Sequence, residues 1–213
     1  MDSNDIIIKV VLFESEFDVI DLILNMYITM LPVIAGGILN MIFTKTAFYK
    51  KNKVPIDKHK VLRDGKRIFG DNKTWIGFVS MIVICSFTQI VSGLASNFLA
   101  INNRNDLYLC NENTILFNLI IGALFGTAYM VLELPNSFIK RRIGIDSGKT
   151  NKGLTGVVFF VIDQVDSLFG VIFVLYIFSD ISICKYFGYI LLGGLTHTVV
   201  NFILLKLKVR KNL

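Results

Sequence analysis

Two carboxylates stand inside an apolar stretch of this 213-residue sequence. Asp163 directly follows the apolar residues 157–162, and Asp166 lies three residues further along. Each carboxylate costs about 2.5–3.5 kcal/mol at the centre of a membrane-spanning helix, and a spacing of three places both on one helix face. Two carboxylates this close repel each other unless a cation lies between them or one is protonated. We expect Mg²⁺, which prefers oxygen ligands and is usually held by one or two carboxylates plus substrate phosphates.

Two other interpretations of the acidic pair stay open at this point. Asp163 and Asp166 would form a structural polar pair if they packed against Lys140 or Arg142. They would form an ion or proton relay if the protein were a transporter. Metal chemistry is favoured over both, because two strongly basic segments are expected on the same side of the membrane.

The first basic segment covers residues 44–74 and holds ten Lys and Arg residues. It ends in Gly70-Asp71-Asn72-Lys73-Thr74, directly before an apolar stretch that starts at Trp75. A helix start with Lys and Thr beside glycine favours an anion such as phosphate, through backbone N–H groups and the helix dipole. The alternative is a solvated loop whose lysines only set the membrane topology.

The second basic segment covers residues 135–153 and holds five Lys and Arg residues. Three of them, Lys140, Arg141 and Arg142, are consecutive, which suits the phosphates of a nucleotide or of a lipid head group. Ser137 precedes them and has a simpler alternative role as the cap of a short helix. Charge that only sets topology is again the alternative for the cations.

The elements that carry these residues are expected to be membrane helices. Hydrophobic residues make up 54% of the chain and its mean hydropathy is +0.62, which is unusual for a soluble domain. Crossing the bilayer takes roughly 20 apolar residues. Five stretches qualify: 19–43, 75–100, 114–134, 154–178 and 186–205. The fold class is therefore expected to be all-α, a polytopic membrane protein with five transmembrane helices.

The distribution of charge predicts the orientation. Segments 1–18, 101–113 and 179–185 hold one Lys or Arg each, whereas the two basic segments and the tail are rich in them. The positive-inside rule then puts the N-terminus outside and the C-terminus inside, which requires an odd number of helices. We expect a multi-pass protein of the cell membrane with its active site on the cytoplasmic face, and no nucleic-acid partner.

Three regions are expected along the chain. Residues 1–18 form an acidic N-terminal extension, residues 19–206 one membrane domain, and residues 207–213 a basic cytoplasmic tail. Cys85, Cys110 and Cys184 lack the spacing of a zinc site. The glycine pairs Gly36-Gly37 and Gly193-Gly194 allow close helix contact within one chain or in a homodimer.

Two separated motifs resemble a known family. Pro55-Ile56-Asp57 with residues 65–77, and residues 136–145 with 163–167, closely resemble the CDP-archaeol synthase family. The pattern Ser137-x-x-Lys-Arg followed by Asp163-x-x-Asp-Ser is also similar to the signature of the broader phosphatidate cytidylyltransferase superfamily. The resemblance covers residues 25–206, which is most of the chain.

The resemblance implies a reaction and its residues. An anionic lipid phosphate attacks the α-phosphate of CTP, with Mg²⁺ present, and gives a CDP-lipid and pyrophosphate. Asp163 and Asp166 would hold the metal, with Asp146 as a further metal ligand, and Lys140 and Arg141 would complete the catalytic set. The lipid would be archaeal ether-lipid phosphate, phosphatidate or a related phosphate. Substrate-binding residues would be Lys66, Arg67, Asp71, Asn72, Lys73, Thr74, Ser137 and Arg142.

Two other functions rank behind this one. A CDP-alcohol phosphotransferase would need a longer pattern of spaced aspartates that this sequence lacks. A small transporter that uses Asp163 and Asp166 as an ion relay is weakened because five helices contain no inverted repeat.

Overall fold

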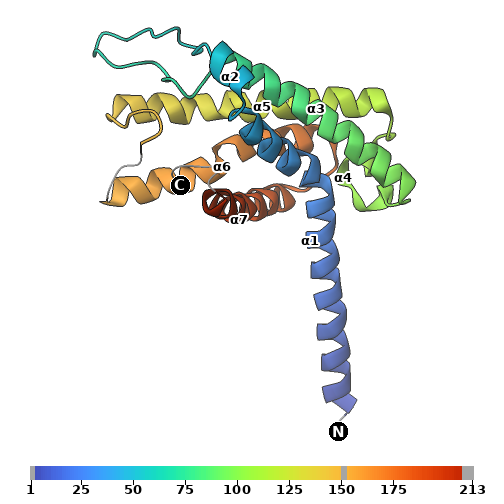
Figure 1. Cartoon of the computed structure of the whole chain (residues 1–213). Helices are drawn as coiled ribbons and strands as arrows, with labels where there is room; N and C mark the ends of the chain where they lie inside the picture. Colours follow the sequence, from blue (N-terminus) through green and yellow to red (C-terminus); the bar gives the residue numbers. More distant parts are fainter. Residues whose placement is uncertain (1–2, 150–152, 208–213) are drawn as a thin grey trace.

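The protein is built from five long helices, as the sequence predicts (Figure 1). The computed structural model describes residues 3–149 and 153–207, with side chains from residue 18 onward. Two isolated bridges, and no β-strand, occur among these residues. All five long helices are apolar enough to cross a membrane. The helices are α1 (Ser3–Phe43), α2 (Ala47–Asn52), α3 (Trp75–Phe98), α4 (Asp106–Cys110), α5 (Ile115–Arg142), α6 (Gly153–Phe178) and α7 (Ile183–Lys206), with a 3₁₀ turn η1 (Asn102–Arg104).

Hydroxyl side chains fix where three of the long helices begin. Thr74, Thr114 and Ser182 each precede a helix and accept a hydrogen bond from the backbone N–H three residues later. Such caps satisfy donors that have no partner inside the helix. Each cap stands directly before an apolar run, so the local sequence sets the boundary at which a helix enters the membrane.

Helix α1 is longer than the predicted span. Its membrane-spanning part is Asp18–Phe43, which Ser3–Asp18 continues without a break, and Figure 1 shows the first half of α1 extending away from the other helices. The apolar residues 6–13 of the acidic extension thus belong to α1. The boundaries of the acidic extension and of the basic tail stay predictions, and residues 208–213 of the tail lie outside the described residues.

Helix α5 also departs from the prediction, and this change shapes the site. Residues 135–142 were expected in a loop, but α5 continues through Pro135 to Arg142. A proline inside a membrane helix is tolerated when neighbouring groups satisfy the freed backbone carbonyl. The motif residues from Asn136 to Arg142 are therefore helical, with one face defined by positions three and four apart.

Small residues let the helices approach closely. A Cβ at Gly126 of α5 would lie 2.6 Å from the Ile82 Cα of α3, and one at Gly170 of α6 would lie 2.8 Å from the Ala128 carbonyl oxygen of α5. Close backbone contact of this kind is how helices associate in lipid, where hydrophobic burial gives little driving force. The result is a stack in which α5 packs between α3 and α6.

The predicted glycine pairs serve contacts within the chain. A Cβ at Gly36 would lie 2.7 Å from the Cys85 sulfur, and one at Gly193 would lie 2.9 Å from Leu168 Cδ1. Both glycines therefore already face a partner helix. The homodimer expected from these pairs stays a prediction.

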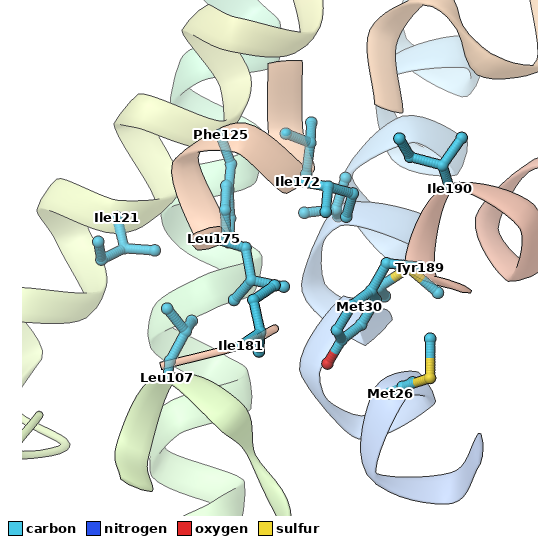
Figure 2. Packing of buried hydrophobic residues seen from close by; sticks show 12 residues of the cluster. Met26, Met30, Leu107, Ile121, Phe125, Ile172, Leu175, Ile181, Tyr189 and Ile190 are labelled. Atoms are coloured by element: carbon cyan, nitrogen blue, oxygen red, sulfur yellow. The ribbon is translucent and has the colours of Figure 1, made fainter. Parts of the chain in front are cut away.

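The apolar core lies toward the α4 end of the helices (Figure 2). Phe125, Ile172 and Tyr189 are almost completely buried there. The Tyr189 hydroxyl donates a hydrogen bond to Asp106 of α4, 2.5 Å away, and the Lys185 ammonium lies 2.8 Å from the same carboxylate. The buried Asp106 carboxylate therefore has two partners at this end of the helices.

Candidate active site

A cavity of about 840 Å³ opens where α5, α6 and α7 meet the loop between α2 and α3. Its apolar wall includes Phe69, Tyr129, Phe159 and Phe160. The polar and charged lining residues are Lys45, Asn72, Lys73, Glu133, Asn136, Ser137, Lys140, Arg141, Asp146, Lys149, Asp163, Asp166 and His197. The two basic segments and the acidic pair therefore line one cavity, although the sequence separates them widely.

The acidic pair on α6 is held by two side chains of α5. The amide nitrogen of Asn136 donates to Asp163 and to Asp166, at 2.6 Å in each case. The Lys140 ammonium forms an ion pair with Asp163 and lies 5.7 Å from the centre of the Phe159 ring. The predicted structural pairing with Lys140 is thus present, and these two donors offset the repulsion between the carboxylates.

The donor set suits a divalent cation. No group of three His, Cys, Asp or Glu side chains arranged for a metal occurs among the described residues. The amide oxygen of Asn136 is buried, however, and accepts no hydrogen bond in the described part of the chain. Amide nitrogen and oxygen exchange places on a flip, and a flipped Asn136 would turn that oxygen toward Asp163 and Asp166. Two carboxylates and an amide oxygen, completed by substrate phosphates, are ligands that Mg²⁺ prefers.

A third acid, Glu133, lines the cavity one turn before Asn136. It forms an ion pair with Lys73, the last cation of the first basic segment. Glu133, Asn136 and Lys140 lie at i, i+3 and i+7 on α5, which places them on one face. The contact between Lys73 and Glu133 ties the loop before α3 to the wall that carries the acidic pair.

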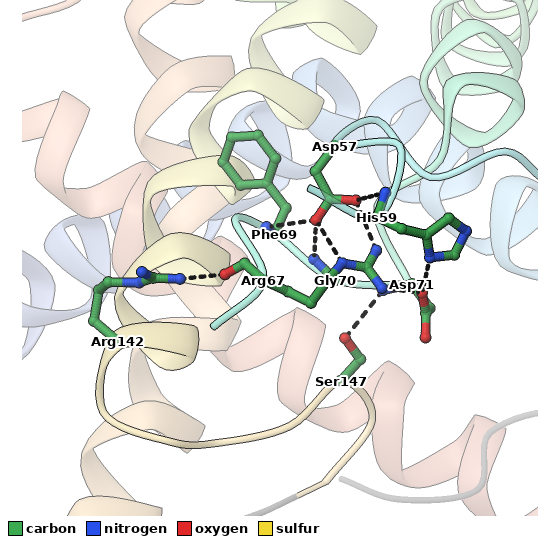
Figure 3. A network of polar contacts seen from close by, with 8 residues as sticks. All are labelled: Asp57, His59, Arg67, Phe69, Gly70, Asp71, Arg142 and Ser147. Atoms are coloured by element: carbon green, nitrogen blue, oxygen red, sulfur yellow. Dashed lines mark hydrogen bonds and ion pairs between the residues drawn. The ribbon is translucent and has the colours of Figure 1, made fainter. Parts of the chain in front are cut away.

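Asp57 organises the loop between α2 and α3 (Figure 3). Its buried carboxylate accepts hydrogen bonds from the backbone N–H groups of His59, Phe69 and Gly70, and two from the guanidinium of Arg67. Burial alone would raise the pKa of this carboxyl, but the bonds from Arg67 and the backbone outweigh burial and hold the pKa well below its usual range. The loop therefore closes around a carboxylate whose ionised form these bonds stabilise.

The two basic loops are clasped to each other. Arg142 at the end of α5 binds both oxygens of Asp64, at 2.8 and 2.7 Å, and stacks at 5.0 Å on the Phe138 ring. The Lys66 ammonium donates to the Arg142 carbonyl at 2.6 Å. The two loops thus lie on the same side of the helices, as the charge pattern predicts.

Five predicted substrate-binding residues do not line the cavity. Arg67 binds Asp57 and Asp71, and the backbone N–H of Asp71 donates to the Ser147 hydroxyl at 3.1 Å (Figure 3). Lys66 and Arg142 belong to the clasp. Thr74 is 1% exposed, and its hydroxyl contacts Tyr49 and caps α3. Through these partners the five residues hold the loops that surround the cavity. Direct contacts of Lys66, Arg67, Asp71, Thr74 and Arg142 with substrate stay predictions.

The other predicted residues line the cavity, with Asp146 set apart from the acidic pair. Asp146 pairs with Lys149 at 2.8 Å, and its side chain is 70% exposed. The bond from Lys149 lowers the pKa of the Asp146 carboxyl. Asp146 therefore stands ionised on the loop side of the cavity, and its role as a metal ligand stays a prediction.

A family model described as CarS-like, CDP-archaeol synthase, matches residues 19–212 of the chain. The chain belongs to this family. Among curated CDP-archaeol synthases, the chain is 31% identical to that of Pyrobaculum islandicum over 161 residues, 76% of this chain and 82% of the relative. It is 27% identical to that of Sulfolobus acidocaldarius over 166 residues, 78% of this chain and 86% of the relative.

A solved structure has the same fold. It is described as "Structural insight into an intramembrane enzyme for archaeal membrane lipids biosynthesis". The TM-score is 0.57 at 21% sequence identity, with 83% of this chain and 92% of that chain covered. The arrangement of five membrane helices is therefore shared with an intramembrane enzyme, and the chain is a multi-pass membrane protein.

In this member of the CDP-archaeol synthase family, the cavity also contains polar residues that the sequence does not assign to the site: Lys45, Glu133, Asn136, Lys149 and His197. Asn136 lies inside the family motif, whereas Glu133 and His197 lie outside both motifs. The spacing of Glu133, Asn136 and Lys140 predicts that all three share one helix face. That prediction requires a helix that continues through Pro135, as α5 does. No spacing in the sequence indicates that His197 lines the cavity, because its position there depends on how α7 packs against α6.

Proposed function

We propose that this cavity is where CTP and the phosphate of an archaeal-type ether lipid react to give CDP-archaeol. A phosphate oxygen of the lipid attacks the α-phosphorus of CTP. The bond from that phosphorus to the oxygen that bridges the α- and β-phosphates breaks, and pyrophosphate leaves with the electron pair. One observation supports this most: Asp163, Asp166 and the cations of both loops line a single cavity between membrane helices.

A cytidylyltransferase reaction requires a divalent cation, and we propose Mg²⁺ held by Asp163, Asp166 and the flipped Asn136. When bound, it would neutralise charge on the triphosphate and on the leaving pyrophosphate. The Asn136 amide nitrogen and the Lys140 ammonium now compensate the carboxylates. A bound metal would compensate the carboxylates in their place, and the Lys140 ammonium could then donate a hydrogen bond to a phosphate oxygen.

The protein's own part in the reaction is positioning and charge neutralisation, which dominate phosphoryl transfer. Lys73, Lys140 and Arg141 approach the cavity from the loop before α3 and from α5. Asn72 stands on the loop that Asp57 closes, so a nucleotide bound there meets a rigid wall. The Phe159 and Phe160 rings line the same cavity and give the reacting lipid an apolar border.

Purified protein in detergent with Mg²⁺ provides the test. We expect pyrophosphate release only when CTP and an ether-lipid phosphate are both present. Each other nucleoside triphosphate, and CTP without lipid, should give background release. Release with phosphatidate in place of the ether lipid would change the proposed lipid but keep the reaction. Background release in every combination would contradict the proposed function.

The alternative function, a small transporter that uses the acidic pair as an ion relay, is disfavoured. The family is one of synthases, and Asp163 and Asp166 face a cavity whose opposite walls carry cations from two loops. An ion relay would need a path to the other side, yet the α4 end is closed by buried residues such as Leu107 and Tyr189.

We further propose that the cavity faces the cytoplasm of a cell membrane, with the N-terminus outside and the C-terminus inside. Both basic loops border the cavity, which agrees with the positive-inside rule. Cys110 and Cys184 are exposed and lie at the opposite end, in α4 and at the start of α7. A membrane-impermeant maleimide should label both in intact cells, and labelling only after lysis would reverse the orientation. Cys85 is buried and serves as the unlabelled control.

A further inference from the structure

Five cations among the described residues line the reaction cavity, and they differ in how the fold engages them. Four have an ion pair or a hydrogen bond within the protein: Lys73 with Glu133, Lys140 with Asp163, Lys149 with Asp146, and Arg141 with the carbonyl oxygen of Ile145. The fifth is Lys45, whose side chain is exposed. In the described part of the chain, its ammonium has neither an ion pair nor a hydrogen bond.

The turn that carries Lys45 is held by the hydroxyls on either side of it. The Thr44 hydroxyl donates to the Met41 carbonyl oxygen at 2.6 Å, and the Thr46 hydroxyl donates to the Phe43 carbonyl oxygen at 2.8 Å. Thr46 is also the N-cap of α2, so the turn is fixed at the end of α1 and at the start of α2. The backbone of Lys45 is therefore held in place while its ammonium stays available for a ligand.

Lys45 stands where a membrane helix meets the head groups of the lipids. The membrane-spanning part of α1 is Asp18–Phe43, and Lys45 follows two residues later. Ile42 and Phe48 on either side of it are 48% and 64% exposed, which is typical of a surface in contact with a membrane. Basic side chains just beyond the end of a membrane helix attract lipid phosphates. Because Lys45 also lines the cavity, its ammonium can meet a lipid phosphate at the site of reaction.

Lys45 reaches the cavity from a different element than the other cations. Met41 and Lys45 line it from the end of α1, whereas the other four cations come from the loop before α3, from α5 and from the segment after α5. Helix α1 packs mainly on α3, and α6, which carries Asp163 and Asp166, packs on α5 and α7. An in-line displacement places the attacking oxygen and the leaving oxygen on opposite sides of the phosphorus. Such a reaction needs cations on more than one wall of the cavity.

We propose that the Lys45 ammonium binds the phosphate of the lipid substrate, while the cations around Asp163 and Asp166 bind the triphosphate of CTP; this inference rests on the proposed function. Two anions must meet in this reaction, and a separate cation for each lowers their repulsion. Among the described cavity cations, Lys45 alone can bind phosphate without giving up a contact that holds the cavity. It would donate a hydrogen bond to one oxygen of the lipid phosphate and leave another oxygen to attack.

Kinetics in mixed micelles, with the mole fraction of ether-lipid phosphate varied at constant detergent, test the proposal. Lys45→Met removes the charge and keeps an unbranched apolar side chain. We expect kcat/KM for the lipid to fall by about tenfold to a hundredfold, as for a lost hydrogen bond to a charged group. Calorimetric binding of CTP with Mg²⁺ should stay within about twofold of the unmodified protein. Lys45→Arg should recover most of the loss, because a guanidinium also binds phosphate.

The matched control is Lys50→Met, because Lys50 is exposed on α2, close to Lys45 in sequence, and lies outside the cavity. Its lipid kinetics should not change. An equal fall in Lys50→Met would overturn the inference, since general attraction of an anionic lipid to a basic surface would then explain both results. Should Lys45→Met not purify as a folded protein, Lys45→Gln decides by the same criteria.

The remaining outcomes separate this inference from the proposed function. Unchanged lipid kinetics in Lys45→Met, with the unmodified protein active, would overturn the role of Lys45 alone. CTP binding weakened by about tenfold in Lys45→Met would also overturn it, because the ammonium would then bind the triphosphate. An unmodified protein without turnover on any lipid would overturn the proposed function and this inference together.

Discussion

Replacing both intramembrane carboxylates, Asp163→Asn with Asp166→Asn, should abolish turnover while leaving the protein folded. The variant loses the proposed metal ligands, and a metal ion contributes several kcal/mol of charge stabilisation. At about 1.4 kcal/mol per factor of ten, we expect kcat/KM for pyrophosphate release to fall by about a thousandfold or more. Thermal stability should change little, because two costly membrane charges disappear while Asn136 and Lys140 lose their charged partners.

The control and a second readout distinguish a functional pair from a structural one. Asp180→Asn, in the exposed segment after α6, should keep full activity. Mn²⁺ binding, measured by electron paramagnetic resonance without nucleotide, should be lost in the double variant and kept in the control. A double variant that turns over CTP at more than about a tenth of the normal rate would refute the metal assignment. Unfolding of the double variant would instead favour the structural interpretation of Asp163 and Asp166.

The helices could be predicted from the sequence because membrane helices obey a simple constraint on length and hydropathy. Thr74 before α3 and Thr114 before α5 mark two starts by local capping chemistry. The end of α5 could not be predicted, because Pro135 and the cations after it are typical of a loop. In the structure α5 continues to Arg142, which contacts Asp64 and Phe138.

The candidate site could be predicted in part, for a physical reason that differs between residues. Asp163 and Asp166 can be recognised as site residues from the sequence, because a charged side chain inside the bilayer costs several kcal/mol. Arg67 and Arg142 were grouped with the phosphate ligands because a sequence shows a cation but not its partner. The structure gives Arg67 to Asp57 and Arg142 to Asp64. The Arg142–Asp64 pair spans 78 residues and depends on the tertiary fold, and the Arg67–Asp57 pair spans 10 residues and depends on how the loop folds back on itself.

The same reasoning explains how Asp57 fits the motif that carried the family resemblance. Its five hydrogen bonds close the loop on itself, so its effect on substrate passes through the loop backbone. Motif residues near a site therefore divide into groups that face the cavity, such as Lys73, and groups that shape the loop behind it. Sequence spacing alone does not separate the two, because both lie in one short segment.

Removing the ammonium that compensates the acidic pair, by Lys140→Met, should change metal binding and turnover in opposite directions. Without nucleotide, Lys140 pairs with Asp163 and competes with a divalent cation for it. Methionine has no charge, so we expect Mn²⁺ to bind about tenfold more tightly, the factor that about 1.4 kcal/mol produces. During the reaction the missing donor is no longer available to phosphate. Loss of one such donor typically costs about 10²–10³ in kcat.

Metal binding measured by electron paramagnetic resonance and pyrophosphate release together decide whether Lys140 has both roles. Lys53→Met is the matched control, because Lys53 is exposed in the loop after α2 and lies outside the cavity. Neither quantity should change there. Weaker Mn²⁺ binding in Lys140→Met would mean that the ammonium orders the carboxylates rather than competing with the metal. Normal turnover would mean that Lys140 never reaches phosphate, and Arg141 and Lys73 would then be the cations that neutralise it.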